Sequence, residues 1–182
     1  MRKQTRTPVL TPEFRLSFPN LFEPREYQGK SSFSMTMVFD KSADLGQLKL
    51  AAKAALDEYF PNGCKNPRNP FSNGDDVSGE WGENFRGCTY VRAKSQFRPK
   101  VVDANLQEII DPDKVYPGCY CRAVVVPYAY DNSGNRGVSF SIESVQMLRD
   151  GERIGGGGSG YVAMFADGTA TAKKDDPFGD AF

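Results

Sequence analysis

The chain has 182 residues, enough for one domain with a sizeable core, and its 23 basic and 23 acidic residues cancel in formal charge. With 13 Phe, 8 Tyr and 1 Trp, its composition is that of a globular protein. No apolar run is long enough to span a membrane or to serve as a signal peptide, so we expect a cytoplasmic protein that does not enter membranes.

Catalytic residue types are poorly represented. The chain has no histidine, which removes the usual general base and any Ser–His or Cys–His nucleophile. A carboxylate-dependent nuclease is the enzymatic alternative, but the acids of NGDD at 73–76 and DPD at 111–113 lie among turn residues, where Asp is common for structural reasons. We expect a protein that is not an enzyme and that uses no cofactor.

The cysteines do not form a metal-binding pattern. None of Cys64, Cys88, Cys119 and Cys121 belongs to a C-x-x-C pair. Cys119 and Cys121 are two residues apart in a predicted strand, so both point to one face. Reduced, half-buried thiols are favoured over a metal site.

Two strands and a helix are predicted first along the chain. In PEFRLSF at 12–18, Phe14, Leu16 and Phe18 alternate with polar residues, and the apolar residues of SSFSMTMVFD at 31–40 are also spaced by two. In SADLGQLKLAAKAALDEYF at 42–60 the apolar spacing becomes helical. This segment predicts an amphipathic helix over part of the core.

A long irregular segment and three further strands follow. Residues 61–87 are rich in Gly, Asn and Pro but contain aromatic and basic residues, as functional or mobile loops often do. Strands are predicted at about 88–97, 119–130 and 138–149, and DNSGNRG predicts a hairpin between the last two.

These elements predict a mainly β fold, a five-stranded OB-fold-like Greek-key barrel with one amphipathic helix and long loops, with a two-sheet sandwich as the alternative. We expect the domain to cover residues 1–166 and a flexible acidic tail to cover 167–182.

The most informative stretch is FRGCTYVRAKSQFRPK at 85–100, which is basic and contains no acid. Read as a strand, it places Val91, Ala93 and Phe97 on one face. The opposite face carries an aromatic residue and cations about 6.6 Å apart, which suits stacked bases and phosphates of an extended polynucleotide. A solvated basic strand is the alternative. The binding residues predicted here are Arg86, Tyr90, Arg92, Lys94, Arg98 and Lys100.

Later tyrosines extend the predicted stacking surface. Tyr128 and Tyr130 share a face at the mouth of the hairpin, and the hairpin loop carries Arg136. Tyr116 and Tyr120 flank the beginning of the same strand. Tyrosines at strand ends are often half-buried core residues, so it is their combination with the basic stretch that suggests base stacking.

Several blocks of the chain resemble one family. RLSFPNLFEP at 15–24, GKSSFSMTMVF at 29–39, AKSQFRPKVVD at 93–103 and above all VYPGCYCRAVVVPYAYDNSGNRGVSFSIESVQMLRDGERIGGG at 115–157 are similar to bacteriophage single-stranded DNA-binding proteins with an OB-fold. The resemblance implies sequence-tolerant binding of single-stranded DNA in the cytoplasm of a bacterial host, during phage replication or recombination. A strand-annealing recombination factor and a virion or assembly protein that binds no DNA are the alternatives.

The C-terminal segment predicts a second interaction. Three acids fall in the last eight residues, so residues 1–174 carry a small positive excess and the end of the chain is acidic. Replicative single-stranded DNA-binding proteins of other lineages end in an acidic arm with a terminal Phe, and DDPFGDAF is similar in kind. We expect this segment to recruit phage replication proteins such as a polymerase, helicase or nuclease. The sequence is also compatible with a homo-oligomer. The residues predicted to bind the partner are Asp175, Asp176, Phe178, Asp180 and Phe182.

Overall fold

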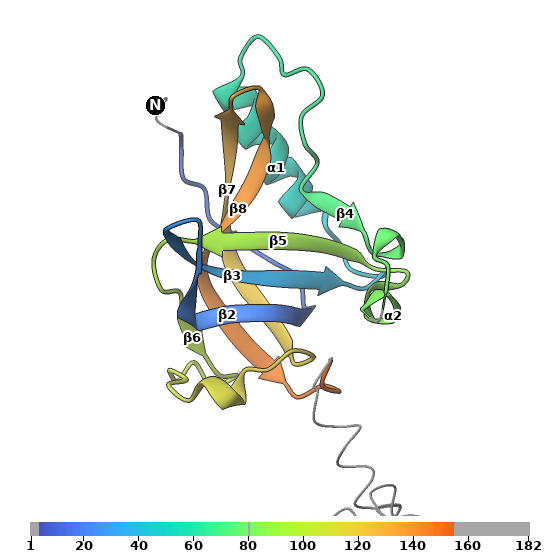
Figure 1. Ribbon diagram of the computed structural model, residues 1–182, viewed down its shortest axis with the longest axis vertical. Helices are drawn as coiled ribbons and strands as arrows, with labels where there is room; N and C mark the ends of the chain where they lie inside the picture. The colour runs from blue at the N-terminus through green and yellow to red at the C-terminus, as the bar shows by residue number, and fades with distance from the viewer. Residues whose placement is uncertain (1–3, 80, 155–182) are drawn as a thin grey trace, which may run out of the picture.

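The computed structural model describes residues 4–79 and 81–154 (Figure 1). The strands are β1 (Val9–Leu10), β2 (Phe14–Tyr27), β3 (Lys30–Phe39), β4 (Phe71–Asn73), β5 (Thr89–Ser95), β6 (Lys100–Val102), β7 (Tyr120–Asn132) and β8 (Asn135–Arg149). The helices are α1 (Gly46–Tyr59) and the short α2 (Gly82–Phe85), and two 3-10 turns, η1 (Gly74–Asp76) and η2 (Pro112–Lys114), lie in loops. The predicted boundary at 166 and the acidic tail lie outside the described residues.

Five strands close into a barrel. Hydrogen bonding runs in the order β2, β3, β5, β8, β7, and β7 pairs again with β2 at Phe14 and Cys121. All neighbours are antiparallel except β5 and β8, which run parallel with Ala93 beside Phe140. This closed Greek-key arrangement is the OB-fold barrel, and the prediction is confirmed over the two-sheet sandwich.

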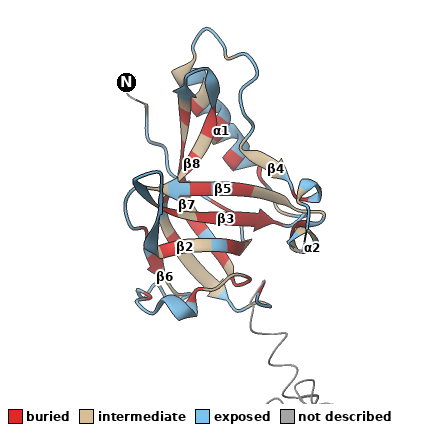
Figure 2. Cartoon of the chain, in the orientation of Figure 1, coloured by how far each residue is buried: buried red, intermediate tan, exposed pale blue. Residues whose placement is uncertain are grey.

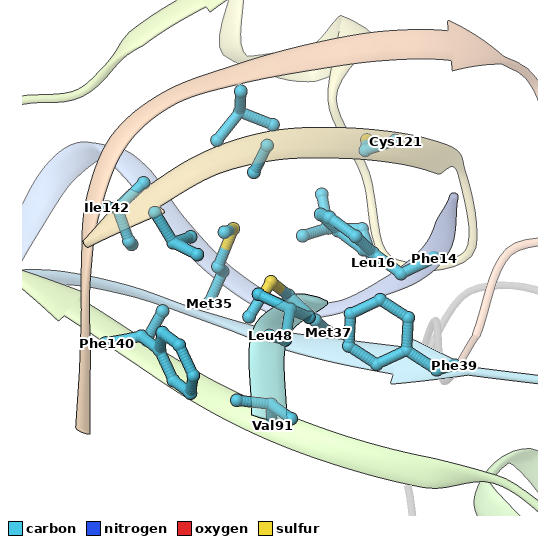
Figure 3. Packing of buried hydrophobic residues seen from close by; sticks show 14 of the residues in the cluster. Phe14, Leu16, Met35, Met37, Phe39, Leu48, Val91, Cys121, Phe140 and Ile142 are labelled. Atoms are coloured by element: carbon cyan, nitrogen blue, oxygen red, sulfur yellow. The ribbon is translucent and has the colours of Figure 1, made fainter. Parts of the chain in front are cut away.

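The barrel interior is filled by the residues that alternation predicts. Phe33, Met35, Met37 and Phe39 of β3 are all buried, and the ring of Phe39 meets that of Phe14 edge to face at 5.7 Å. Figure 3 shows Met35, Met37 and Phe39 meeting side chains from β2, β5, β7 and β8, and Figure 2 shows buried residues concentrated in the strands of the barrel.

Helix α1 closes one end of the core. It buries Leu48, Ala52 and Ala55 and packs against β7 and β8 (Figure 1). It begins later than the apolar spacing predicts, because Ser42 forms a turn with its N–H and Oγ donating to the Asp40 carboxylate. Within the described residues no helix is long and apolar enough to cross a membrane.

Two aromatic residues predicted to face the core are exposed instead. Phe18 has φ of 46° at a bulge between Ser17 and Asn20, which turns its side chain outward and leaves it 48% exposed. Phe97 is 81% exposed because β5 ends at Ser95, whose hydroxyl accepts the Phe97 N–H. The period-two interpretation was therefore wrong at both positions.

Candidate nucleic-acid interface

The outer face of β5 carries the predicted basic strip. Val91 and Ala93 are buried inside the barrel, whereas Arg92 and Lys94 are exposed. We call the outward residues Tyr90, Arg92 and Lys94 the β5 strip. The alternation predicted from the sequence is confirmed for this part of the strand.

The β5 strip continues across two neighbouring strands as a polar row. Lys94 lies opposite Ser34 of β3, and Ser34 lies opposite Asn20 of β2. The Asn20 amide donates to the Ser34 hydroxyl at 3.3 Å. Lys94 is exposed and its two polar neighbours are half-buried, so the row leads from the strip to β2 without a carboxylate.

An aromatic cluster borders this row. The ring centroids of Tyr90 and Phe85 are 5.3 Å apart, those of Phe85 and Phe18 are 6.4 Å apart, and those of Phe18 and Trp81 are 5.2 Å apart. Phe85 is buried, whereas Trp81 is 37% exposed. The Arg92 guanidinium lies 5.8 Å from the Tyr90 centroid, so the more accessible stacking rings are Phe18 and Trp81.

A groove of about 700 Å³ opens from the aromatic cluster along β2. Phe18 and Trp81 line one part of it, and Tyr116 lines another. The Arg153 guanidinium lies 4.7 Å from the Tyr116 centroid. We call this cavity the β2 groove. Its principal aromatic, cationic and polar lining residues are Phe18, Asn20, Arg25, Trp81, Tyr116 and Arg153.

Tyr116 is fixed in the β2 groove as a neutral phenol. Its hydroxyl donates to Asp150 at 2.7 Å and accepts the N–H of Gly151 at 3.2 Å. Burial and the hydrogen bond to Asp150 raise the pKa of Tyr116, so the ring carries no charge at neutral pH. Asp113 is the one carboxylate among the described lining residues, against two arginines.

The combined surface suits an anionic, base-bearing chain. Arginine and lysine side chains attract phosphates, and exposed rings provide stacking platforms that accept any base. Neither interaction distinguishes one base from another. The arrangement therefore has the chemical groups that a nucleic-acid strand requires.

Three of the predicted cations lie off the β5 strip. Arg86 caps the C-terminus of α2 and is exposed. Arg98 lies beyond the end of β5, with its guanidinium 5.6 Å from the Phe22 centroid. Lys100 begins β6 and pairs with Ser144 of β8. The prediction of one continuous strand face from Tyr90 to Arg98 was wrong, because β5 ends at Ser95.

The predicted tyrosines of β7 are divided between its two ends. Tyr120 is covered by the Arg149 guanidinium at 3.7 Å from its centroid. Tyr128 and Tyr130 share a face of the hairpin, as predicted. Tyr130 lies ten residues beyond Tyr120, which is roughly 33 Å measured along the strand. They do not form one stacking surface with Tyr120.

Arg136 is engaged within the hairpin. Its side chain forms an ion pair with Asp131 at 2.8 Å and lies 5.8 Å from the Phe60 centroid. It therefore lies beside Phe60, the residue that follows α1.

Sequence reasoning misses the two most accessible rings of the aromatic cluster. Alternation assigns Phe18 to the core because it does not reveal a bulge. Trp81 lies in the long 61–87 segment, where the pattern of the sequence gives the single tryptophan no role. The Phe-Pro-Asn sequence at 18–20 is the available signal, since Pro interrupts regular strand pairing.

The cysteines form one buried pair and two separate thiols. The sulfur atoms of Cys119 and Cys121 are 3.7 Å apart inside the barrel. The hydrogen bond with Cys119 and burial raise the pKa of Cys121, which keeps its thiol neutral. Among residues 4–79 and 81–154, no group of three or more Cys, Asp or Glu side chains is placed to hold a metal ion.

Comparison with known proteins gives a family for this chain. Residues 7–177 match the family model described as Enterobacter phage Enc34, ssDNA-binding protein. A curated relative, putative protein p50 of Acyrthosiphon pisum secondary endosymbiont phage 1, is 35% identical over 167 residues, which cover 84% of this chain and 89% of that protein.

Solved structures of phage proteins share the fold. The single-stranded DNA-binding protein of bacteriophage Enc34 in complex with ssDNA matches with a TM-score of 0.70 at 20% identity, over 81% of this chain and 89% of that chain. The single-stranded DNA-binding protein gp2.5 of bacteriophage T7 matches with a TM-score of 0.60 at 16% identity, over 94% and 99%. These are binding proteins rather than enzymes, in line with the expectation from the sequence. The chain belongs to the phage single-stranded DNA-binding protein family represented by the Enc34 protein.

Proposed function

We propose that this protein binds single-stranded DNA without sequence preference in the cytoplasm of a bacterial host, where it protects and organises strands during phage replication or recombination. The strand follows the β5 strip, crosses the polar row at Ser34 and Asn20, and enters the β2 groove. The observation that carries the proposal is the junction of exposed cations with exposed rings. Arg92 and Lys94 adjoin a cluster from which Phe18 and Trp81 reach solvent.

The chemistry of this surface favours DNA single strands over duplex. A ring of Trp81 or Phe18 can stack only on a base whose face is free, and bases in a duplex are stacked on one another. The cations contribute affinity that depends on salt but not on sequence. The structure of the Enc34 protein in complex with ssDNA supports this assignment, because the two chains share a fold.

The acidic C-terminal segment is proposed to recruit partners. Asp175, Asp176 and Asp180 supply negative charge, and Phe178 and Phe182 supply rings for an apolar slot on a replication protein such as a polymerase, helicase or nuclease. The same segment can compete with DNA for the cations of the body, since both are anionic.

A gel-shift assay with single-stranded DNA, duplex DNA and RNA tests the proposal. A shift of intact single strands that exceeds the shift of duplex supports it. Cleaved products would indicate a nuclease, and no shift would indicate an assembly protein. Accelerated pairing of complementary strands in the same assay would indicate a strand-annealing factor.

A further inference from the structure

A second groove lies on the side of the sheet that faces α1. It has a volume of about 680 Å³ and lies between α1 and β4. Its apolar lining includes Leu56, Phe71 and Val138. Phe71 stands opposite Val91, whose side chain points into the barrel, so the groove opens on the opposite side of the sheet from the β5 strip. We call it the helix groove.

The charge of the helix groove is positive. Lys49, Lys53 and Arg68 line it, and none of its described lining residues is an acid. Lys53 pairs with Asp57, but both side chains are more than half exposed, so this pair holds the cation only weakly. The Arg68 guanidinium has no ion pair within residues 4–79 and 81–154. An occupant of this groove is expected to be anionic.

Phe71 gives the helix groove an aromatic wall. Its ring is half-buried and packs edge to face on Phe140 at 6.0 Å. The Lys49 ammonium lies 5.9 Å from the Phe71 centroid. The pairing of a cation with a partly exposed ring repeats the combination that Arg92 and Tyr90 form on the β5 strip.

The short strand β4 lies between the helix groove and the β5 strip. β4 has three residues and pairs with the edge of β5, where Ser72 lies opposite Tyr90. Figure 1 shows β4 at the end of β5 that adjoins α2, where the long loop from α1 ends. Ser72 lines the helix groove and Tyr90 belongs to the β5 strip. A DNA strand that passes over β4 would therefore run from one surface to the other.

We propose that the helix groove is a second subsite for the same DNA strand, which leaves the β5 strip at Tyr90 and crosses β4 at Ser72. Lys49 and Arg68 contact its phosphates, and the ring of Phe71 adjoins a base. This inference rests on the proposed function. An acidic peptide would also complement the charge of the helix groove. Only a nucleic-acid strand, however, explains why the helix groove adjoins the β5 strip, so this continuity favours nucleic acid.

Binding to oligothymidylates of two lengths tests the second subsite. Lengths of about 6 and about 16 nucleotides lie within the range that one OB fold occupies. In the full chain, Lys49→Gln and Arg68→Gln should leave affinity for the short strand unchanged. Each should weaken the long strand and flatten its log–log salt slope by about 0.7, which corresponds to about fivefold between 1 M and 0.1 M salt.

Lys114→Gln is the matched control, because Lys114 lies beside Asp111 and Asp113 in a different cavity. It should leave the affinity for both oligonucleotides unchanged. The thermal unfolding temperatures of all three variants should match that of the parent protein. If Lys49→Gln and Arg68→Gln change the affinities for the short and the long oligonucleotide equally, or change neither, the second subsite is overturned while the proposed function stays intact.

Two further outcomes separate the alternatives. Failure of the parent protein to bind either length would overturn the proposed function and the second subsite with it. Binding of a Glu- and Phe-containing peptide that is lost in Lys49→Gln, with no change for the long strand, would overturn the subsite and assign the groove to a protein partner.

Discussion

At the scale of single residues, the binding surface depends on rings that are exposed and held in place. The ring of Trp81 packs against that of Phe18, and Phe18 stacks on buried Phe85. Phe85 in turn contacts Tyr90 edge to face. A ring held in this way loses little conformational freedom when a base stacks on it. Phe97 is more exposed, but no ring contact holds it within the described part of the chain.

Replacing Trp81 by Ala should weaken binding of single-stranded DNA by about 1–3 kcal/mol, the usual contribution of one base–aromatic stack. The salt slope should stay unchanged, because the ring carries no charge. Trp81→Phe should retain most of the affinity. Fluorescence anisotropy of a labelled strand at several salt concentrations measures both quantities, and an unchanged affinity in Trp81→Ala would remove this ring from the interface.

Replacing Lys94 by Ala should flatten the salt slope by about 0.7 and weaken all sequences alike, because the ammonium meets a phosphate rather than a base. Lys114→Ala removes the same charge beside Asp111 and Asp113, from a residue that does not line the β2 groove, and should leave the slope unchanged. Identical slopes in Lys94→Ala and the parent protein would place the DNA elsewhere.

At the scale of elements, the short helix α2 is what brings Trp81 and Phe85 over the barrel. Trp81 is its N-cap residue, and α2 packs against η1. Gly74 of η1 approaches it closely, and a Cβ there would lie 1.9 Å from the Phe85 carbonyl oxygen and 2.7 Å from that of Cys88. Only a residue without a side chain fits between these two carbonyl groups.

Gly74→Ala should therefore displace α2, lower the free energy of unfolding by about 1–3 kcal/mol and weaken DNA binding in the protein that remains folded. Gly63→Ala is the control, because Gly63 has φ of +87° but a Cβ added to it would meet no atom within 4 Å. It should cost stability through backbone strain alone. Urea unfolding and strand binding measured together distinguish the two, and full affinity in Gly74→Ala would contradict the positioning role of α2.

The elements also show what the sequence can predict. Period-two alternation identified the barrel strands and the outward placement of Arg92 and Lys94, because both depend on local geometry. It failed at Phe18 and Phe97, where a bulge and a side-chain turn change the direction of the chain. It could not reveal the β2 groove, since Trp81, Tyr116 and Arg153 come together only through the closure of the barrel.

At the scale of the whole molecule, a mildly basic body is joined to an acidic end. Asp175, Asp176 and Asp180 belong to the same chain as the cations of the proposed DNA-binding surface. With the flexible tail that the sequence predicts, the effective concentration would be of the order of millimolar. Competition between the acidic segment and DNA is therefore expected to depend on salt.

Deleting residues 175–182 should leave the barrel folded and should raise affinity for single-stranded DNA, most at low salt where charges are least screened. The same deletion should abolish binding to a replication partner. Phe182→Ala should weaken the partner contact and leave DNA affinity almost unchanged, because the competition is electrostatic. A truncated protein that binds DNA no more tightly at any ionic strength would rule out the competition, and one that still binds every partner would rule out recruitment.

The most direct test of the account uses the single tryptophan of the chain, which lies in the aromatic cluster and lines the β2 groove. Titration of the unmodified protein with oligothymidylate, followed by Trp81 fluorescence, should give saturable quenching that added salt reverses. Duplex DNA at the same concentration should quench far less. A strand that binds in a gel shift yet leaves Trp81 fluorescence unchanged would contradict the proposed path of the DNA.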